Sequence, residues 1–137
     1  MKNLYFLLLL ITFYSHAEDS FITKNDGSKQ NIKSNSFRVD FNDKLIYYTL
    51  TTNNSEIKMS FNDFISVEFG VNKFKTFKLN NSKEIKGYFV LTESIDKTLI
   101  SISKADDDED SKKITYEFLI IDSNNQIGYT NLAGRQS

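Results

Sequence analysis

Residues 64–70 read Phe-Ile-Ser-Val-Glu-Phe-Gly, and this stretch decides the fold class of the chain. Apolar residues alternate with polar ones from Ile65 to Phe69, and Gly70 ends the run. A period of two, carried by β-branched and aromatic residues, is typical of a half-buried strand. Two further apolar runs, around Phe77 and Phe89, are separated by small polar residues, which predicts a hairpin. The predicted class is all-β.

Upstream residues add strands of the same kind. The tetrapeptide Asn25-Asp26-Gly27-Ser28 predicts a hairpin with a type I′ turn, because Asp-Gly tolerates positive φ. Its return strand, Lys29 to Lys33, has few apolar residues and is predicted to be a sheet edge. The run from Leu45 to Leu50 is apolar on both faces, which predicts a strand covered on both sides, either central in a sandwich or crossed by a loop.

Three local irregularities are expected in this part of the chain. Ser60 with Asp63 three residues later fits a capping box for a single helical turn. The apolar parity slips between Phe74 and Phe77, which predicts a β-bulge. Gly87 inside a strand predicts a bend or a close approach of another part of the chain.

Strands at 98–103, 113–121 and 127–130 bring the predicted total to about ten short strands. Their connections are too short for crossover helices, so strands adjacent in sequence should pair antiparallel as a meander. A strongly curved sheet or up-and-down barrel is slightly favoured over a sandwich of two facing sheets.

The N-terminus has the pattern of a secretory signal peptide. Lys2 supplies a positive charge, Leu4 to Tyr14 is almost wholly apolar, and Ser15 to Ala17 ends in small residues. A membrane-spanning helix needs roughly 20 apolar residues, so a retained anchor is the weaker interpretation. We therefore expect a signal peptide at 1–17, cleaved after Ala17, and a single β domain at 18–137 with no stable membrane anchor.

Composition excludes several chemistries. The only histidine is His16, in the expected leader, and the chain has no cysteine. Disulfides, Ser-His-Asp and Cys-His catalysis, and zinc or haem sites with His or Cys ligands therefore cannot form in the mature chain. The net charge of −1 does not indicate nucleic-acid binding, and no cofactor is predicted.

One acidic segment resembles a calcium loop in its spacing. Asp106, Asp108, Asp110 and Glu117 fall at positions 1, 3, 5 and 12 of the EF-hand template. Position 6 is Ser111 instead of glycine, and a strand is predicted where an EF-hand has its second helix. The favoured interpretation is a solvated acidic loop, with a weak calcium site as the alternative.

Aromatic residues on the strands could line a cavity for an apolar or sugar ligand. Tyr47, Tyr88 and Phe89 are the candidates, although aromatic residues more often belong to a core. No pair of carboxylates can be placed at a defined separation from the sequence.

The function expected from these features is non-catalytic. The predicted export signal, together with the lack of His and Cys in the expected mature chain and of any catalytic motif, favours a small secreted or periplasmic β-protein. Such a protein would act as a binding or interaction module of the bacterial envelope. The composition, which is rich in Asn, Lys, Ile and Phe and lacks Pro and Trp, indicates an AT-rich bacterial coding bias, and the bacterial setting is expected on that ground alone. The alternatives are a protein inhibitor or immunity-type partner and, less favoured, a hydrolase that uses two carboxylates.

Overall fold

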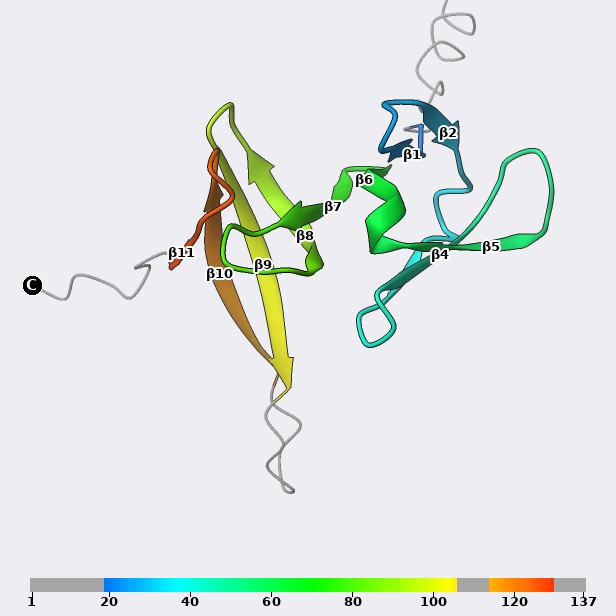
Figure 1. Cartoon of the computed structure of the whole chain (residues 1–137). Coiled ribbons are helices and arrows are strands. Elements are labelled where there is room, and N and C mark those ends of the chain that lie inside the picture. Colours follow the sequence, from blue (N-terminus) through cyan, green and yellow to red (C-terminus); the bar gives the residue numbers. More distant parts are fainter. Residues whose placement is uncertain (1–18, 106–113, 130–137) are drawn as a thin grey trace, which may run out of the picture.

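The computed structural model describes residues 19–105 and 114–129 (Figure 1). These residues form eleven strands and one turn of 3-10 helix, η1, at Phe61–Asp63. The strands are β1 Phe21–Lys24, β2 Lys29–Asn31, β3 Arg38–Asp40, β4 Leu45–Thr49, β5 Glu56–Ser60, β6 Phe64–Phe69, β7 Asn72–Lys78, β8 Ile85–Glu93, β9 Lys97–Ala105, β10 Ile114–Asp122 and β11 Ile127–Tyr129. The all-β prediction is confirmed, and none of the described residues belongs to a helix long and apolar enough to cross a membrane.

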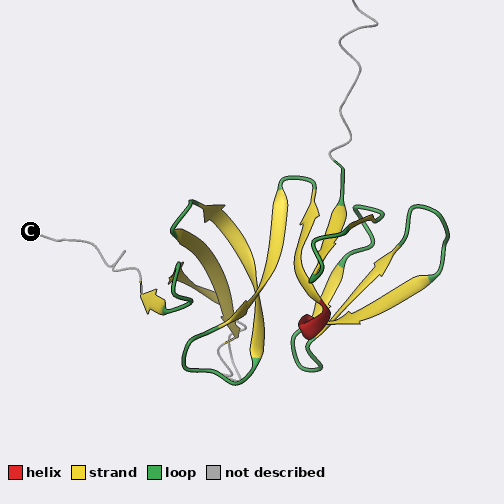
Figure 2. Ribbon diagram, turned by 45° about the horizontal axis from the view of Figure 1, so that its top comes forward, coloured by secondary structure: helices red, strands yellow, loops and turns green. Residues whose placement is uncertain are grey.

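The strands form two sheets in which every pair is antiparallel (Figures 1 and 2). The larger sheet has eight strands in the order β11-β10-β9-β8-β7-β6-β1-β2, and the smaller has the order β3-β4-β5. The predicted meander holds from β6 to β11. It fails at β1, which pairs with β6, because the small sheet is inserted between β2 and β6 in the sequence. As predicted, β2 is an edge strand. The predicted cover on both sides of the Leu45–Leu50 strand is not found among the described residues: β4 buries Ile46 and Tyr48 on one face, whereas Leu45, Tyr47 and Thr49 on the other face are only partly buried.

The first core lies between the small sheet and one face of β1, β6 and β7. Ile46 and Tyr48 of β4 are buried in one cluster with Ile22, Val67 and Phe74 of the large sheet. An isolated bridge between Ile32 and Leu50 joins the two sheets at their margin. Buried aromatic and aliphatic surface of this kind contributes most of the stability of a domain without disulfides.

The second core lies on the opposite face of the large sheet, over β7 to β10. It consists of Phe77, Leu79, Ile100, Leu119 and Ile121. Asn80, after β7, donates its backbone N–H to the carbonyl of Asn125, in the β10–β11 turn, at 3.0 Å. Since three strand spacings separate these positions along the sheet, the sheet must curl back on itself here, as Figure 2 shows.

Strand β7 takes part in both cores, and this corrects the predicted bulge. Phe74 packs in the first core and Phe77 in the second. Residues an odd number apart on a strand point to opposite faces, so a regular strand meets both requirements. The register of β7 with β6 and β8 is unbroken. The irregularities lie instead at Thr23/Lys24 in β1 and at Val90/Thr92 in β8.

The first hairpin also differs from its prediction. Only Gly27 of the predicted turn has a positive φ, +81°, and its N–H donates to the carbonyl of Lys24 at 2.9 Å. Lys24 N–H in turn donates to the carbonyl of Ser28 at 2.9 Å, which leaves a three-residue loop with glycine at its left-handed position. The Asp26 carboxylate accepts a hydrogen bond from the backbone N–H of Ser28, and Asp26 has a negative φ, whereas a type I′ turn needs a positive φ there.

The predicted helical turn after Ser60 is confirmed as η1. The Ser60 hydroxyl caps it by accepting from the N–H of Asn62 at 3.3 Å, one residue earlier than a capping box requires.

Candidate functional site

Strands β8 and β9 are not paired with one another over four of the nine residues of each strand. The ladder between them begins at Phe89↔Ser101 and runs toward the β8–β9 turn. Residues 85–88 of β8 pair with β7, and residues 102–105 of β9 pair with β10, but no pairing across the gap joins these two segments in the described residues. We call this gap the β8–β9 fork.

At the fork, β8 and β9 begin to pack against different cores. Ile85, at the start of β8, packs against the first core, whereas Ile102 of β9 packs against the second. Gly87 allows β8 to approach the first core, because a Cβ added there would lie 2.3 Å from Phe74 Cζ and 2.9 Å from Phe61 Cε2. The close approach predicted at Gly87 is therefore confirmed.

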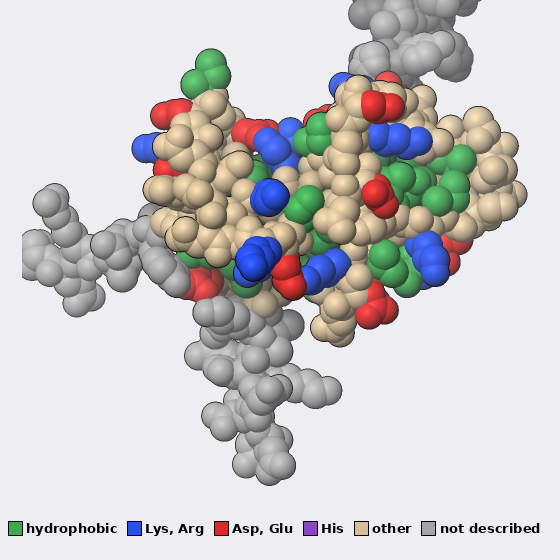
Figure 3. All heavy atoms as spheres, viewed as in Figure 1, with side chains coloured by type: hydrophobic (Ala, Val, Ile, Leu, Met, Phe, Trp, Pro, Cys, Tyr) green, Lys and Arg blue, Asp and Glu red, His purple; other side chains and the backbone are tan. Residues whose placement is uncertain are grey.

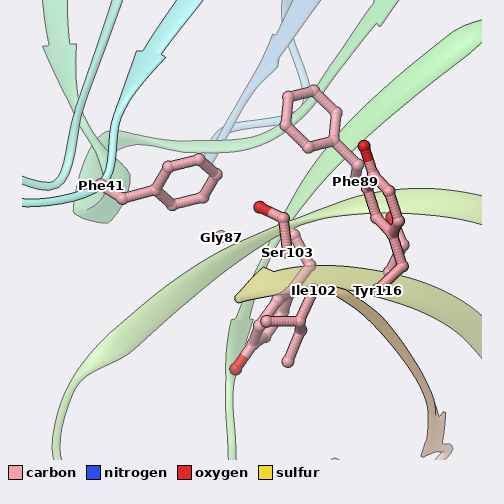
Figure 4. Close-up of a pocket in the computed structure, with 8 residues that line it drawn as sticks. Phe41, Gly87, Phe89, Ile102, Ser103 and Tyr116 are labelled. Atoms are coloured by element: carbon pink, nitrogen blue, oxygen red, sulfur yellow. The ribbon is translucent and has the colours of Figure 1, made fainter. Parts of the chain in front are cut away.

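A hollow of about 480 Å³ lies at the fork (Figure 4). The rings of Phe41, Phe89 and Tyr116 stand around it, and Ser103 lies between them. Phe41 comes from the β3–β4 turn of the small sheet, and its ring centroid is 6.3 Å from that of Phe89 in an edge-to-face arrangement. The remaining lining residues are Gly87, Tyr88, Ser101 and Ile102.

The sheet face that continues from this hollow presents partly exposed apolar side chains, and no strand of the described chain lies over it. Phe89 and Leu91 of β8 are 37% and 52% exposed, and Tyr116 and Phe118 of β10 are 65% and 39% exposed. Ser101 of β9 lies between Phe89 and Phe118 in register. We call the hollow and this continuing face the trough. Its floor contains the small residues Gly87, Ser101 and Ser103, and its walls are the aromatic side chains described above.

The trough carries hydroxyl groups but no charge. The lining residues that the structure describes include no Asp, Glu, Lys or Arg. The hydroxyls of Ser101 and Ser103 make no hydrogen bond to any other described residue. A ligand that enters the trough can therefore exchange water for hydrogen bonds to these hydroxyls without breaking a hydrogen bond between described residues.

The three aromatic residues predicted to line a cavity lie in different places. Phe89 forms a wall of the trough. Tyr88 borders the trough, but its ring turns to the opposite face and packs 6.2 Å from that of Phe77, where burial raises the pKa of its phenol. Tyr47 does not line the trough; it lies beneath the guanidinium of Arg38, 4.0 Å from the ring centroid, on the small sheet.

Three of the predicted calcium ligands, Asp106, Asp108 and Asp110, lie outside the described residues. Glu117 lies in β10 opposite Ile102, on a strand as predicted. In residues 19–105 and 114–129 no three side chains of His, Cys, Asp or Glu gather in a way that could hold a metal ion.

A charged cluster crosslinks β6, β7 and β8 on the face away from the trough. Lys73 Nζ lies 2.8 Å from Glu93 Oε2 and 3.6 Å from Glu68 Oε1, and Lys75 also pairs with Glu93. Burial alone would raise the pKa of Glu93, but hydrogen bonds from the two lysines outweigh it and lower that pKa. Acidic and basic side chains are likewise interspersed on the face shown in Figure 3. The cluster fixes strand register and has no unpaired carboxylate to act on a substrate.

Sequence reasoning missed Phe41, Ser101, Ser103 and Tyr116 as lining residues. The segment Ile100-Ser101-Ile102-Ser103 contained a usable signal, because strict alternation places both hydroxyls on one face. Phe41 had no such signal, since it reaches the trough from the other sheet.

Comparisons of the chain with protein-family models, with curated proteins and with solved structures gave no match.

Proposed function

We propose that this protein is an exported, non-catalytic binding module and that the trough at the β8–β9 fork is its binding site. The observation that carries the proposal is a hollow of about 480 Å³ with three aromatic rings around it and no charged side chain among its described lining residues. Ligand sites are commonly about 300–1,000 Å³, mostly apolar, with a few polar groups that orient the ligand.

Burial of apolar surface favours the binding of a ligand in the trough. Large apolar side chains gain free energy when they leave water, at about 25 cal/mol per Å². Phe89, Leu91, Tyr116 and Phe118 form an exposed group on one sheet face, and contiguous exposed apolar surface is typical of interaction sites. A ligand over these residues would supply the cover that the small sheet gives to β1, β6 and β7.

A binding assay with the apolar dye ANS tests the site. We expect ANS fluorescence to rise with the wild-type protein and to fall back in Ser101→Trp, which fills the trough while adding apolar surface. The matched control is Ile95→Ser, which removes a fully exposed aliphatic side chain from the β8–β9 turn. Equal dye binding by wild type and Ser101→Trp, with both folded by circular dichroism, would contradict the proposal.

Export is part of the proposal and rests on the leader pattern. Residues 1–17 lie outside the described residues. Mass spectrometry of the protein recovered from the envelope or medium should find Glu18 as the first residue. An intact Met1 in a membrane fraction would instead mean that the apolar run is retained.

A second candidate is a protein partner of the inhibitor or immunity type. Val71, in the β6–β7 turn, and Ile95, in the β8–β9 turn, are almost fully exposed. Alternate turns of an antiparallel meander lie at the same end of the sheet, so these aliphatic side chains could contact one partner. Such a partner would lose affinity in Ile95→Ser and keep it in Ser101→Trp, the reverse of the pattern expected for the trough.

The hydrolase alternative needs two carboxylates in one concave site, roughly 5 to 10 Å apart. No acidic side chain is present among the described residues that line the trough.

A further inference from the structure

The fork leaves two strand edges facing one another. Among the described residues, 85–88 have a ladder partner on the β7 side only, and 102–105 have one on the β10 side only. In a strand, backbone N–H and C=O groups point alternately to the two sides, so each segment directs about half of its backbone groups into the gap. These groups need partners, and water supplies them only while the gap stays wet.

A peptide that pairs with these two edges must have an extended backbone. A helix has a diameter of about 10–12 Å with its side chains and presents no free backbone groups along its length, so it cannot satisfy the edges. An extended peptide carries alternating donors and acceptors and pairs with exposed strand edges in many recognition systems. Four residues of extended chain span roughly 13 Å, which matches the unpaired length of each segment.

The side chains around the gap specify the peptide further. One face of the gap holds Phe41, Phe89 and Tyr116, and the other continues into the second core through Tyr88 and Ile102. Side chains of an inserted strand alternate between two faces, and here both faces are lined by apolar groups. A charged side chain would lose hydration without meeting an opposite charge in the described lining, which is costly.

We infer that the trough binds an extended, uncharged peptide segment rich in aromatic and β-branched residues, which pairs its backbone with the free edges of β8 and β9. This inference rests on the proposed function, since it specifies the ligand of the same site. Ser101 and Ser103 add side-chain hydrogen bonds on the face of Phe89.

Affinity selection tests the peptide class. A library of capped hexapeptides built from Thr, Val, Phe, Tyr and Leu would be offered to wild type, to Ser101→Trp and to Ile95→Ser. We expect enrichment by wild type and Ile95→Ser and loss of enrichment in Ser101→Trp. An enriched peptide N-methylated at alternate residues should bind at least tenfold more weakly in one of the two N-methyl registers, because that register removes the paired donors.

Amide hydrogen exchange supplies a readout that side-chain stacking would not change. In the free protein, gap-facing amides of residues 85–88 and 102–105 should exchange much faster than those of the paired part of β8 and β9, and the selected peptide should slow them at least tenfold. Binding of the peptide without this protection would overturn the inference.

Two further kinds of probe distinguish a failure of the peptide inference from a failure of the proposed binding site. Chitohexaose and cellohexaose represent neutral sugars, and ANS represents an apolar small molecule. If ANS or a hexaose binds in wild type and not in Ser101→Trp, while the library gives no enrichment, then the site stands and the peptide inference is wrong. If no probe distinguishes wild type from Ser101→Trp, both the inference and the proposed function are wrong.

Discussion

Substitution of Gly87 tests the packing that opens the fork. A Cβ at this position would lie 2.3 Å and 2.7 Å from two ring atoms of Phe74 and 2.9 Å from one of Phe61. Ordinary contact begins near 3.4 Å, so the Phe74 ring would have to move by about 1.1 Å. That ring is fully buried, and it lies within 6.3 Å, centroid to centroid, of five other phenylalanine rings, at positions 37, 41, 61, 64 and 89.

The expected cost follows from the rigidity of close-packed interiors. Overpacking a well-packed core costs typically 1–3 kcal/mol, and we expect Gly87→Ala at about 2–3 kcal/mol because two rings must move. The assay is urea unfolding followed by far-ultraviolet circular dichroism, with the midpoint and slope fitted together. Phe74→Leu should relieve the clash, so Gly87→Ala/Phe74→Leu should be at least about 1 kcal/mol more stable than the sum of the single changes predicts.

Gly128 provides the matched control. It lies in β11, and the nearest atom to an added Cβ is the carbonyl oxygen of Ile120 at 3.9 Å. Gly128→Ala meets no obstacle and restricts the unfolded chain, so it should be neutral or stabilise by up to about 1 kcal/mol. If Gly87→Ala costs no more than about 0.5 kcal/mol, the close approach at β8 does not hold as described.

Two further predictions concern charge. Because the pKa of Glu93 is lowered in the folded state, its ion pairs should contribute stability above its ordinary pKa, near 4.5, and lose it as pH falls through the folded value. Glu93→Gln should therefore cost about 1 kcal/mol or less at pH 7 and flatten the fall in urea midpoint between pH 5 and 3; an unchanged slope would refute this. For the acidic loop, replacement of Asp106, Asp108 and Asp110 by Asn should alter stability by no more than about 0.5 kcal/mol per site, and calcium should not change the melting temperature. A calcium-dependent rise of several degrees that the triple variant abolishes would instead identify a bound ion.

The period-two pattern was sufficient to predict most of the strands, and the short connections were sufficient to predict the antiparallel meander from β6 to β11. Neither predicted the pairing of β1 with β6. The pattern was not sufficient to predict which face each run buries. The predicted bulge would place Phe74 and Phe77 on one face, whereas each faces a different core. The same limit applies to Tyr88 and Phe89, since neighbours on a strand point to opposite faces and only one ring can line the trough.

The position of the trough follows from how the two cores divide the large sheet. The small sheet has only three strands, and its buried residues cluster with β1, β6 and β7. From β7 onward the sheet curls back on itself around second-core residues that include Phe77 and Ile100, and its outer face is left without a covering sheet in the described chain. Strand β8 lies at the boundary between the cores, because Ile85 packs against the first core and Tyr88 and Val90 pack against the second. The pairing of β8 with β9 is lost at this boundary, before Phe89. The position of the binding site that we propose therefore follows from the topology: the ladder opens between β8 and β9, beside the strand β7 that takes part in both cores, and aromatic side chains from the β3–β4 turn, β8 and β10 surround the opening.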